Sequence, residues 1–573
     1  MSQFKYIIFC SFLLTACAQA PARPPDEHPA DPHESLSEEA PVLPNIGLSD
    51  ELLYEFLLTE IAVQRGNVAI AVQGSRDLAN KTHDPRLAMR AAQLALQAGQ
   101  LDKAIEALKI WREVDPASQM AMRMYASVLV RSGRLDEARQ ELVKVLEANQ
   151  ANAGHIFYQI YQMLAPYPNK DEALKLILGL AQPYPRVAEA HWAVAQLAQA
   201  SGDEKLALDE ARQARSLRPE WDMAVSLEAF LLKKSAPQQG LDLLRRYLSD
   251  YPDAQEIRLQ YARALLEQKQ YKEARNQFQF LADQNPDNPE TAFAIALISL
   301  QMKDFKGAED HLKQALNKGR KDQNTVRYYL GQLGEAKQSN DEAIGYYRQV
   351  NGGEYQFAAQ IRIAFLLHKS GRFDEAIQQL HQIQPADNQQ SVQLISVEAQ
   401  ILRETNRLSE AYLVMQHGLA KLPNDPDLLY GTAMLADMLG QPDVFEQLMR
   451  KLIKIQPDHA HAYNALGYGL LERNERIPEA MKLVEKALQL APDDPAIMDS
   501  VGWGYYRSGK LDESVKMLRR AFAGSPDPEI AAHLGEVLWI RGDKAEARKV
   551  WQDSLKDNPD NDKLQAAIKK FMP

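Results

Sequence analysis

The sequence predicts an all-α fold: a superhelical solenoid of about 14–15 helix–turn–helix units, called repeats below, preceded by a disordered tether. Three observations carry this prediction. A small residue recurs at a nearly constant period, a proline follows it at a fixed distance, and no run of alternating apolar residues indicates a sheet. We expect the solenoid to occupy residues 50–560 and a C-terminal capping helix to occupy residues 561–573.

The period is defined by fifteen positions, called anchors below, most of which are small residues that stand five places after a turn residue. Successive anchors are 33 to 35 residues apart, and 34 is the most frequent spacing. A period in this range is typical of repeats that stack on their neighbours into a solenoid. The anchors are Ala71, Ala104, Ala138, Ala173, Ala207, Gly240, Ala274, Ala308, Ala343, Ala376, Ala411, Phe445, Ala480, Ser514 and Ala547.

Two further positions explain how each repeat folds. A small residue stands twelve places before eleven of the anchors, and two facing small residues allow two helices to approach closely. A proline stands twelve places after ten of the fifteen anchors, and it ends the second helix because it keeps the preceding residue out of the α region. The expected small residue is replaced at Tyr161 and Glu228, which precede their anchors by twelve places, and at the anchor Phe445, so we expect distorted repeats there.

These positions together give the chain a family resemblance. Over about residues 50–560 it resembles the tetratricopeptide repeat (TPR) family, with a motif that is degenerate in any one repeat and consistent across the set. The resemblance implies a superhelix of helix hairpins that binds other proteins.

One stretch, Gly504 to Lys510, also fits the spacing G-x-x-x-x-G-K of a phosphate-binding loop. Such a loop follows a strand, and its lysine precedes Ser or Thr. Here the preceding residues have helical periodicity, and Leu511 follows the lysine. Related stretches such as "LVRSGRLDEAR" and "LHKSGRFDEAI" recur without the lysine, so we interpret Gly509 as the turn glycine of its repeat.

Residues 1–16 are predicted to be a lipoprotein signal peptide. The sequence "MSQFKYIIFCSFLLTAC" has one early cation, Lys5, followed by an apolar run from Tyr6 to Leu14. This run is much shorter than the roughly 20 residues that a membrane-spanning helix needs.

The end of this segment, "LTAC", resembles the bacterial lipobox, whose cysteine receives the lipid. The resemblance implies lipid attachment at Cys17, and the alternative is an ordinary signal peptide with an incidental cysteine. Because Ala18 rather than Asp follows, the resemblance also implies an outer-membrane location facing the periplasm. The other cysteine, Cys10, would be removed with the signal, which leaves no thiol for a disulfide or a metal site.

Residues 17–49 are predicted to form an acidic, proline-rich tether that begins at the lipidated cysteine. The stretch "AQAPARPPDEHPADPHESLSEEAPVLPNIGLSD" over residues 18–50 contains seven prolines, seven acidic residues including Asp50 of the first helix, and one arginine. Such a segment cannot bury enough apolar surface to fold, and it would hold the solenoid away from the membrane.

The composition and motifs favour a protein without chemistry of its own. A net charge of −11 and an isoelectric point of about 5.7, without a basic stripe, disfavour nucleic acid as a partner. The sequence has no G-x-S-x-G or H-E-x-x-H motif, and the pair His459 and His461 has no neighbouring carboxylate pair. We therefore expect no enzyme activity, no cofactor, no metal and no small-molecule substrate.

Function should then lie on the surface of the solenoid. In TPR arrays the fifth position of each first helix, fifteen places before the anchor, points into the concave groove. From Tyr158 to Ile361 these positions are apolar or aromatic, which is typical of interface hot spots. The alternative is a register error of one residue, which would make them core residues. The predicted groove residues are Tyr158, Trp192, Leu259, Phe293, Tyr328 and Ile361.

The groove lacks the asparagines by which some TPR proteins clamp a carboxylate. The positions four residues further along each first helix carry no asparagine from Gln93 to Gln332. A folded or extended apolar partner is therefore favoured over the C-terminus of a chaperone.

The first helix of the solenoid, "DELLYEFLLTEIAVQ" over residues 50–64, is apolar nearly all round. A terminal repeat normally has a polar outer face, so this helix needs a cover. The tether could fold back over it through Val42, Leu43 and Ile46. Our preferred interpretation is that Tyr54 and Leu58 form a docking surface for a partner or a second copy.

The whole layout has a closer resemblance. The lipobox, the acidic tether, the stretches "ELLYEFLLTEIAVQRGNVAIA" and "DPRLAMRAAQLALQAGQ" and the continuous TPRs are similar to the lipoprotein adaptor of a periplasmic carboxyl-terminal processing protease. The resemblance implies that the chain binds this serine protease and promotes degradation of peptidoglycan cross-link hydrolases. The alternative is an assembly scaffold for a secretion, pilus or exopolysaccharide-export machine.

Overall fold

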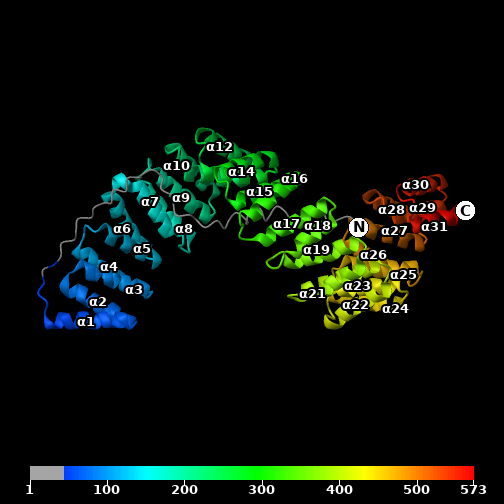
Figure 1. The fold of residues 1–573 in the computed structure, drawn as a ribbon, viewed down its shortest axis with the longest axis horizontal. Coiled ribbons are helices and arrows are strands. Elements are labelled where there is room, and N and C mark those ends of the chain that lie inside the picture. The colour runs from blue at the N-terminus through cyan, green and yellow to red at the C-terminus, as the bar shows by residue number, and fades with distance from the viewer. Residues whose placement is uncertain (1–43, 45, 573) are drawn as a thin grey trace. The chain divides into compact units, whose positions relative to one another are not determined.

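The computed structural model of the protein describes residue 44 and residues 46–572, and within them the fold is all-α (Figure 1). These residues form 31 α-helices and one short 3-10 helix, and they contain no strand. The helices form fifteen successive hairpins, from α1 and α2 to α29 and α30, followed by the single helix α31. The predicted all-α solenoid of about 14–15 repeats is therefore confirmed. The predicted signal peptide and Cys17 lie outside the described residues.

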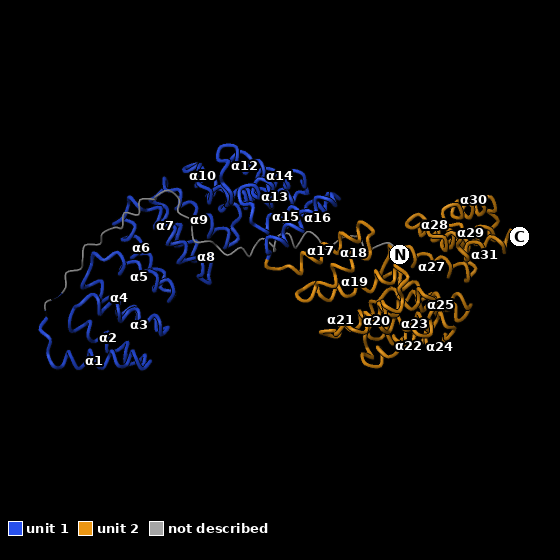
Figure 2. Tube along the Cα trace, in the orientation of Figure 1, with its two compact units in different colours: residues 1–320 blue, residues 321–573 orange. Residues whose placement is uncertain are grey.

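The chain divides into two compact units, residues 1–320 and 321–573, which are described separately here (Figure 2). Within each unit a second helix packs both on its own first helix and on the first helix of the next repeat. The helices of unit 1 are α1 (Asp50–Gln64), α2 (Val68–Thr82), α3 (Pro85–Gln97), α4 (Leu101–Val114), α5 (Gln119–Arg131), α6 (Leu135–Ala148), η1 (Gln150–Asn152), α7 (Ala153–Leu164), α8 (Lys170–Ala181), α9 (Ala188–Ser201), α10 (Glu204–Leu217), α11 (Asp222–Ser235), α12 (Pro237–Asp250), α13 (Gln255–Glu267), α14 (Tyr271–Gln284), α15 (Pro289–Gln301) and α16 (Phe305–Asn317).

Unit 2 continues the same alternation. Its helices are α17 (Gln323–Ala336), α18 (Asn340–Arg348), α19 (Gln356–Lys369), α20 (Phe373–His381), α21 (Asn388–Glu404), α22 (Leu408–Lys421), α23 (Pro426–Met438), α24 (Pro442–Ile455), α25 (Ala460–Glu472), α26 (Ile477–Leu490), α27 (Pro495–Arg507), α28 (Leu511–Gly524), α29 (Pro528–Arg541), α30 (Lys544–Asp557) and α31 (Asp562–Phe571).

The anchors occupy the same place in every repeat. All fifteen occupy the fourth position of the second helix of their repeat, and all fifteen are buried. Where the facing residue is glycine, there is no room for a larger one. A Cβ atom on Gly331 would lie 2.5 Å from the ring of Tyr347, and one on Gly535 would lie 2.1 Å from Nε1 of Trp551.

The turn inside most hairpins contains a left-handed residue. Five places before the anchor, glycine has a positive φ at positions such as Gly133 and Gly542, and Lys269 and Lys303 adopt the same conformation. Gly509 lies in the turn between α27 and α28 with φ +77°, and a helix precedes it. The interpretation of this residue as a turn glycine rather than part of a phosphate-binding loop is therefore confirmed.

The prolines end the second helices as expected. Arg218 and Ala491 each precede a proline and cap their helix with φ and ψ of −141° and 77°, and of −137° and 77°. These angles lie outside the α region, because the ring of the following proline keeps the preceding residue out of that region.

The three irregular repeats keep their helices and differ in how they pack. Helix α7, which contains Tyr161, follows the short helix η1 and packs mainly on α9 rather than on α8. Glu228 is buried and forms salt bridges with Arg212 and Arg215. The bulky anchor Phe445 is buried, and Gly469 of the next repeat leaves space beside its ring, since a Cβ there would lie 3.0 Å away.

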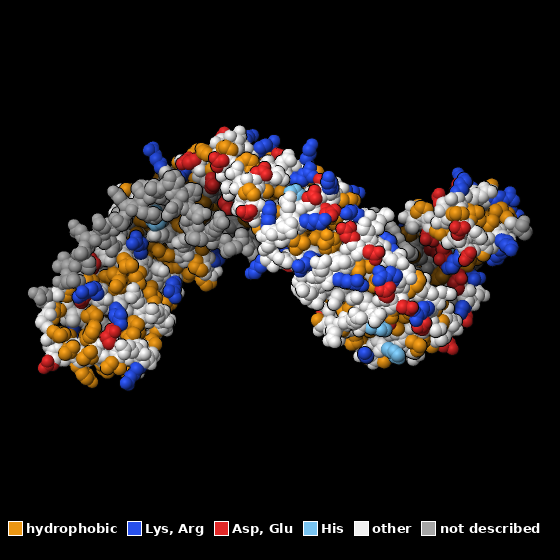
Figure 3. Space-filling view, in the orientation of Figure 1, with side chains coloured by type: hydrophobic (Ala, Val, Ile, Leu, Met, Phe, Trp, Pro, Cys, Tyr) orange, Lys and Arg blue, Asp and Glu red, His pale blue; other side chains and the backbone are white. Residues whose placement is uncertain are grey.

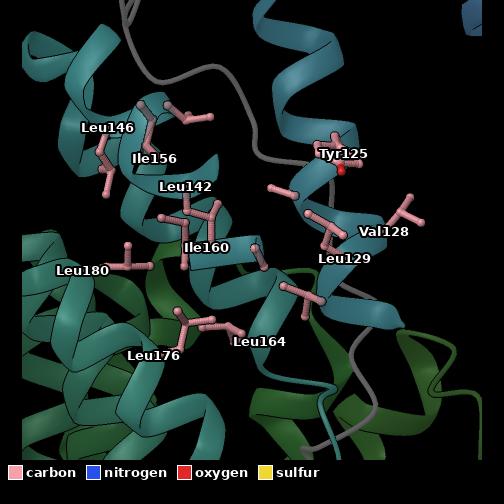
Figure 4. Close-up of a cluster of buried hydrophobic side chains, with 14 of the residues drawn as sticks. Tyr125, Val128, Leu129, Leu142, Leu146, Ile156, Ile160, Leu164, Leu176 and Leu180 are labelled. Atoms are coloured by element: carbon pink, nitrogen blue, oxygen red, sulfur yellow. The ribbon is translucent and has the colours of Figure 1, made fainter. Parts of the chain in front are cut away.

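The hydrophobic core runs from repeat to repeat instead of forming a single centre. Figure 4 shows one stretch of it in unit 1, where buried side chains of four consecutive helices meet. They are Tyr125, Val128 and Leu129 of α5, Leu142 and Leu146 of α6, Ile156, Ile160 and Leu164 of α7, and Leu176 and Leu180 of α8.

Replacing Gly535 with Ala should lower the free energy of unfolding by about 1–3 kcal/mol, because overpacking forces Trp551 to move. Trp551 is fully buried, and its Nε1 donates a hydrogen bond to the carbonyl oxygen of Ala532 at 3.3 Å. The matched control is Gly345→Ala in α18, where nothing lies within 4 Å of the new Cβ. That change should stabilise by about 0.5–1 kcal/mol, since alanine is the better helix former. Equal urea midpoints for the two variants would contradict the close-approach account.

Candidate partner-binding surfaces

Helix α1 presents an apolar surface at the N-terminal end of unit 1, called the α1 patch below. Its six members are large apolar side chains with exposed fractions between 41% and 67%. Figure 3 shows hydrophobic side chains gathered over this end of the chain. The patch consists of Leu53, Tyr54, Phe56, Leu57, Leu58 and Ile61.

The contacts that hold α1 in place are mostly polar or small. Lys81 of α2 forms salt bridges with Glu51 and Glu55. The hydrogen bonds in these two pairs raise the pKa of Lys81, and the bond to Glu55 has the larger effect. Thr59 is buried against Gly74 of α2, where an added Cβ would lie 2.1 Å from its hydroxyl oxygen. Only Thr59 and Ala62 of α1 are buried, so most of its apolar surface is not used in folding.

At the C-terminal end of unit 2, a single further helix packs on the last hairpin. Helix α31 covers α29, and its Leu564 is fully buried. Phe571 stacks on Trp551 with a centroid distance of 6.0 Å. The last turn of α31 carries Lys569 and Lys570. The C-terminal repeat therefore has a cover, whereas no helix among residues 46–572 covers the α1 patch.

Of the three tether residues predicted to cover α1, only Ile46 lies among the described residues. Ile46 is 44% exposed, so this residue does not bury itself on α1. Val42 and Leu43 lie outside the described residues, as do the other residues before position 44. Tyr54 and Leu58, the two predicted docking residues, are 67% and 43% exposed.

The predicted groove residues fall into two groups. Tyr158, Leu259 and Tyr328 are half-buried, with part of each side chain open to solvent. Trp192, Phe293 and Ile361 are only 3%, 3% and 4% exposed. The expectation that all six line an open groove is therefore corrected: the last three are core residues in this structure.

Contacts with bulky neighbours account for the burial of Trp192 and Phe293. The ring of Trp192 lies 4.8 Å from that of Tyr161 and 5.9 Å from that of Trp221. In the same unit, the guanidinium of Arg320 lies 4.0 Å from the centroid of Phe293 and forms a salt bridge with Glu290. The ring of Trp192 therefore packs between its own repeat and the repeats on either side.

The paired histidines of α25 have structural partners. The Nδ1 atom of His459 accepts a hydrogen bond from the backbone N–H of Ala462 at 3.1 Å and so caps the helix. Its ring stacks on Tyr430 at a centroid distance of 5.6 Å. Within the described residues, no group of three or more His, Cys, Asp or Glu side chains is placed to hold a metal ion.

None of the helices in the described part of the chain has the length and apolar character needed to span a bilayer.

Comparison with known proteins gives the following matches. Profiles of the tetratricopeptide repeat match residues 231–279, 265–333, 89–153 and 502–562. The TPR repeat-containing protein PA4667 of Pseudomonas aeruginosa is 33% identical over 543 residues, which cover 94% of this chain and 90% of that protein.

Two further matches are more distant. Cellulose synthase operon protein C of Pseudomonas fluorescens is 24% identical over 491 residues, which cover 75% of this chain and 36% of that protein. Among solved structures, TTC0263, a thermophilic TPR protein of Thermus thermophilus, is 21% identical with a TM-score of 0.29. That match covers 32% of this chain and 98% of the other.

Truncation of Trp192 to Ala should lower the free energy of unfolding by about 3–5 kcal/mol, as expected for removal of a buried aromatic side chain. Tyr158→Ala, at a half-buried position in contact with the same ring at 5.6 Å, should lower it less. Urea unfolding followed by circular dichroism would compare the two variants. A Trp192→Ala variant as stable as the wild type would restore the interpretation of this residue as an exposed groove residue.

Proposed function

Because the chain belongs to the tetratricopeptide repeat family, we propose that it is a non-catalytic scaffold, anchored as a lipoprotein in the outer membrane and facing the periplasm. TPR repeats bind other proteins, and the partner proposed here is a carboxyl-terminal processing protease. As an adaptor, the chain would bring that protease to peptidoglycan hydrolases and so control their turnover. No chemistry of its own is part of this role.

The observation that carries the proposal is the α1 patch. Burial of one large apolar side chain contributes about 1.5–3 kcal/mol, and association has to offset about 4–15 kcal/mol of lost translational and rotational freedom. The six side chains of α1 are 41–67% exposed, so about half of that contribution is available from each, and their sum of roughly 5–9 kcal/mol lies within the range that association must offset. A surface of this kind at the end of a repeat array favours a protein partner over a small ligand.

The sequence before the solenoid supports the membrane part of the proposal. The lipobox ending at Cys17 and the proline-rich, acidic segment after it are those of an anchored protein on a tether. Multiple acyl chains make such an anchor stable, whereas a single chain gives only marginal membrane binding.

A second candidate is an assembly scaffold for an exopolysaccharide-export, secretion or pilus machine. The match to Cellulose synthase operon protein C over 75% of this chain favours it. This chain spans 36% of that protein, so the role of the longer protein passes to this one only as a hypothesis.

Replacing Tyr54 and Leu58 together with Glu should abolish capture of the protease. Two carboxylates in the middle of an apolar contact would be buried without partners. Affinity purification of the tagged full-length chain from solubilised membranes, followed by mass spectrometry, measures the capture. Because both side chains are exposed, circular dichroism and the melting temperature should stay close to those of the wild type.

The matched control for this pair is Phe230→Glu with Leu413→Glu, at two positions that are 51% and 50% exposed on other helices. The control should capture the protease and its hydrolase substrates as the wild type does. Wild-type capture by a folded Tyr54→Glu/Leu58→Glu variant would remove α1 as the docking helix. Recovery of polysaccharide-export or pilus subunits in place of a protease would favour the second candidate.

Replacing Cys17 with Ser should move the protein from the membrane fraction to the soluble fraction, because serine cannot receive the lipid through a thioether. Cell fractionation followed by immunoblotting would measure the distribution, with Cys10→Ser as the control that should stay in the membrane. Retention of the Cys17→Ser variant in the membrane would rule out the lipid anchor.

A further inference from the structure

A cavity of about 610 Å³ opens in unit 2 among α21, α23 and the start of α25. Its floor is apolar and consists mainly of the buried residues Ala399, Met415 and Leu435. Met434 and Met438 form part of its wall, and Met438 is 51% exposed. We call this cavity the methionine pocket.

A glycine shapes the floor of the pocket. A Cβ atom on Gly431 of α23 would lie 2.1 Å from the terminal methyl carbon of Met415. The missing Cβ of Gly431 leaves this space to the end of the Met415 side chain of α22. Methionine side chains are flexible and polarisable, so a wall built from them adapts to different long apolar groups.

The rim of the pocket is rich in hydrogen-bond donors. Arg403, near the end of α21, is exposed and forms no salt bridge with any residue between positions 46 and 572. His459 uses Nδ1 as an acceptor for the N–H of Ala462, so in its neutral form the ring carries its proton on Nε2. His461 adds a second imidazole, and Asp427 is the one carboxylate among the lining residues.

We propose that the methionine pocket binds an extended segment of a partner protein in which a long apolar side chain is flanked by carboxylates. The apolar side chain fills the space above Met415 and Leu435, and a carboxylate pairs with the guanidinium of Arg403. A planar guanidinium can hold a carboxylate through two parallel hydrogen bonds, which fixes the position of the segment. Charge complementarity thus selects an acidic segment over a basic one.

The inference rests on the proposed scaffold function only in that the ligand is a segment of a protein. It does not depend on the protease, and the pocket lies in unit 2 whereas the α1 patch lies in unit 1. Loss of protease capture and loss of peptide binding are therefore separate results.

The test uses four pools of fluorescein-labelled eleven-residue peptides with degenerate flanks around a central Glu-Leu-Glu, Gln-Leu-Gln, Glu-Ala-Glu or Lys-Leu-Lys. Fluorescence anisotropy with the purified full-length chain compares their affinities. We expect the Glu-Leu-Glu pool to bind about tenfold more tightly than the Gln-Leu-Gln pool, the effect of a charge-assisted hydrogen bond. The Glu-Ala-Glu pool should also bind more weakly, because it leaves the floor empty.

Two variants locate the binding. Arg403→Glu should reverse the preference in favour of a Lys-Leu-Lys pool, whereas Lys421→Glu at the end of α22 should leave it unchanged. Met434→Glu should abolish binding of every leucine pool, and Leu413→Glu, at an exposed position outside the pocket, should not. The proposal is overturned if no pool binds, if the alanine pool binds as well as the leucine pool, or if Arg403→Glu keeps the preference for glutamate.

Discussion

The close approach of the two helices in each repeat is the constraint on which the rest of the structure depends. Each anchor sits at the fourth position of its second helix and is buried, so the tightly packed position recurs at the same place in the second helix of each repeat. This contact sets where the turn must reverse the chain and where the second helix must stop. The left-handed residue and the proline are then placed by the same geometry, at fixed distances before and after the anchor.

Much of the fold follows from these local rules, and so could be predicted from the sequence alone. Helix hairpins depend on residues within one period, and the anchors identify all fifteen of them. One shift in the pattern was missed. In the repeat anchored by Ala480, the residue twelve places earlier is Tyr468, and the close contact is made instead by Gly467, where a Cβ would lie 3.0 Å from the carbonyl oxygen of Ala480.

The surfaces were less predictable because they depend on contacts between repeats. The helical position of Trp192 was clear from the sequence, but its burial comes from Tyr161 and Trp221, which belong to the repeats on either side. The methionine pocket combines four helices, and no residue in it is unusual for its own helix. The α1 patch could be anticipated because one helix alone, apolar nearly all round, has more apolar surface than a single neighbour can bury.

The nearest-neighbour packing within each unit also limits how the length of this chain can change. A hairpin touches the hairpins beside it and little else, so removal or duplication of one whole period preserves the stacking surfaces of those that remain. An insertion of half a period would bring two first helices together and leave small residues without a facing partner. The array can therefore lengthen or shorten only by whole hairpins, whereas the end helices α1 and α31 each occur once among the described residues.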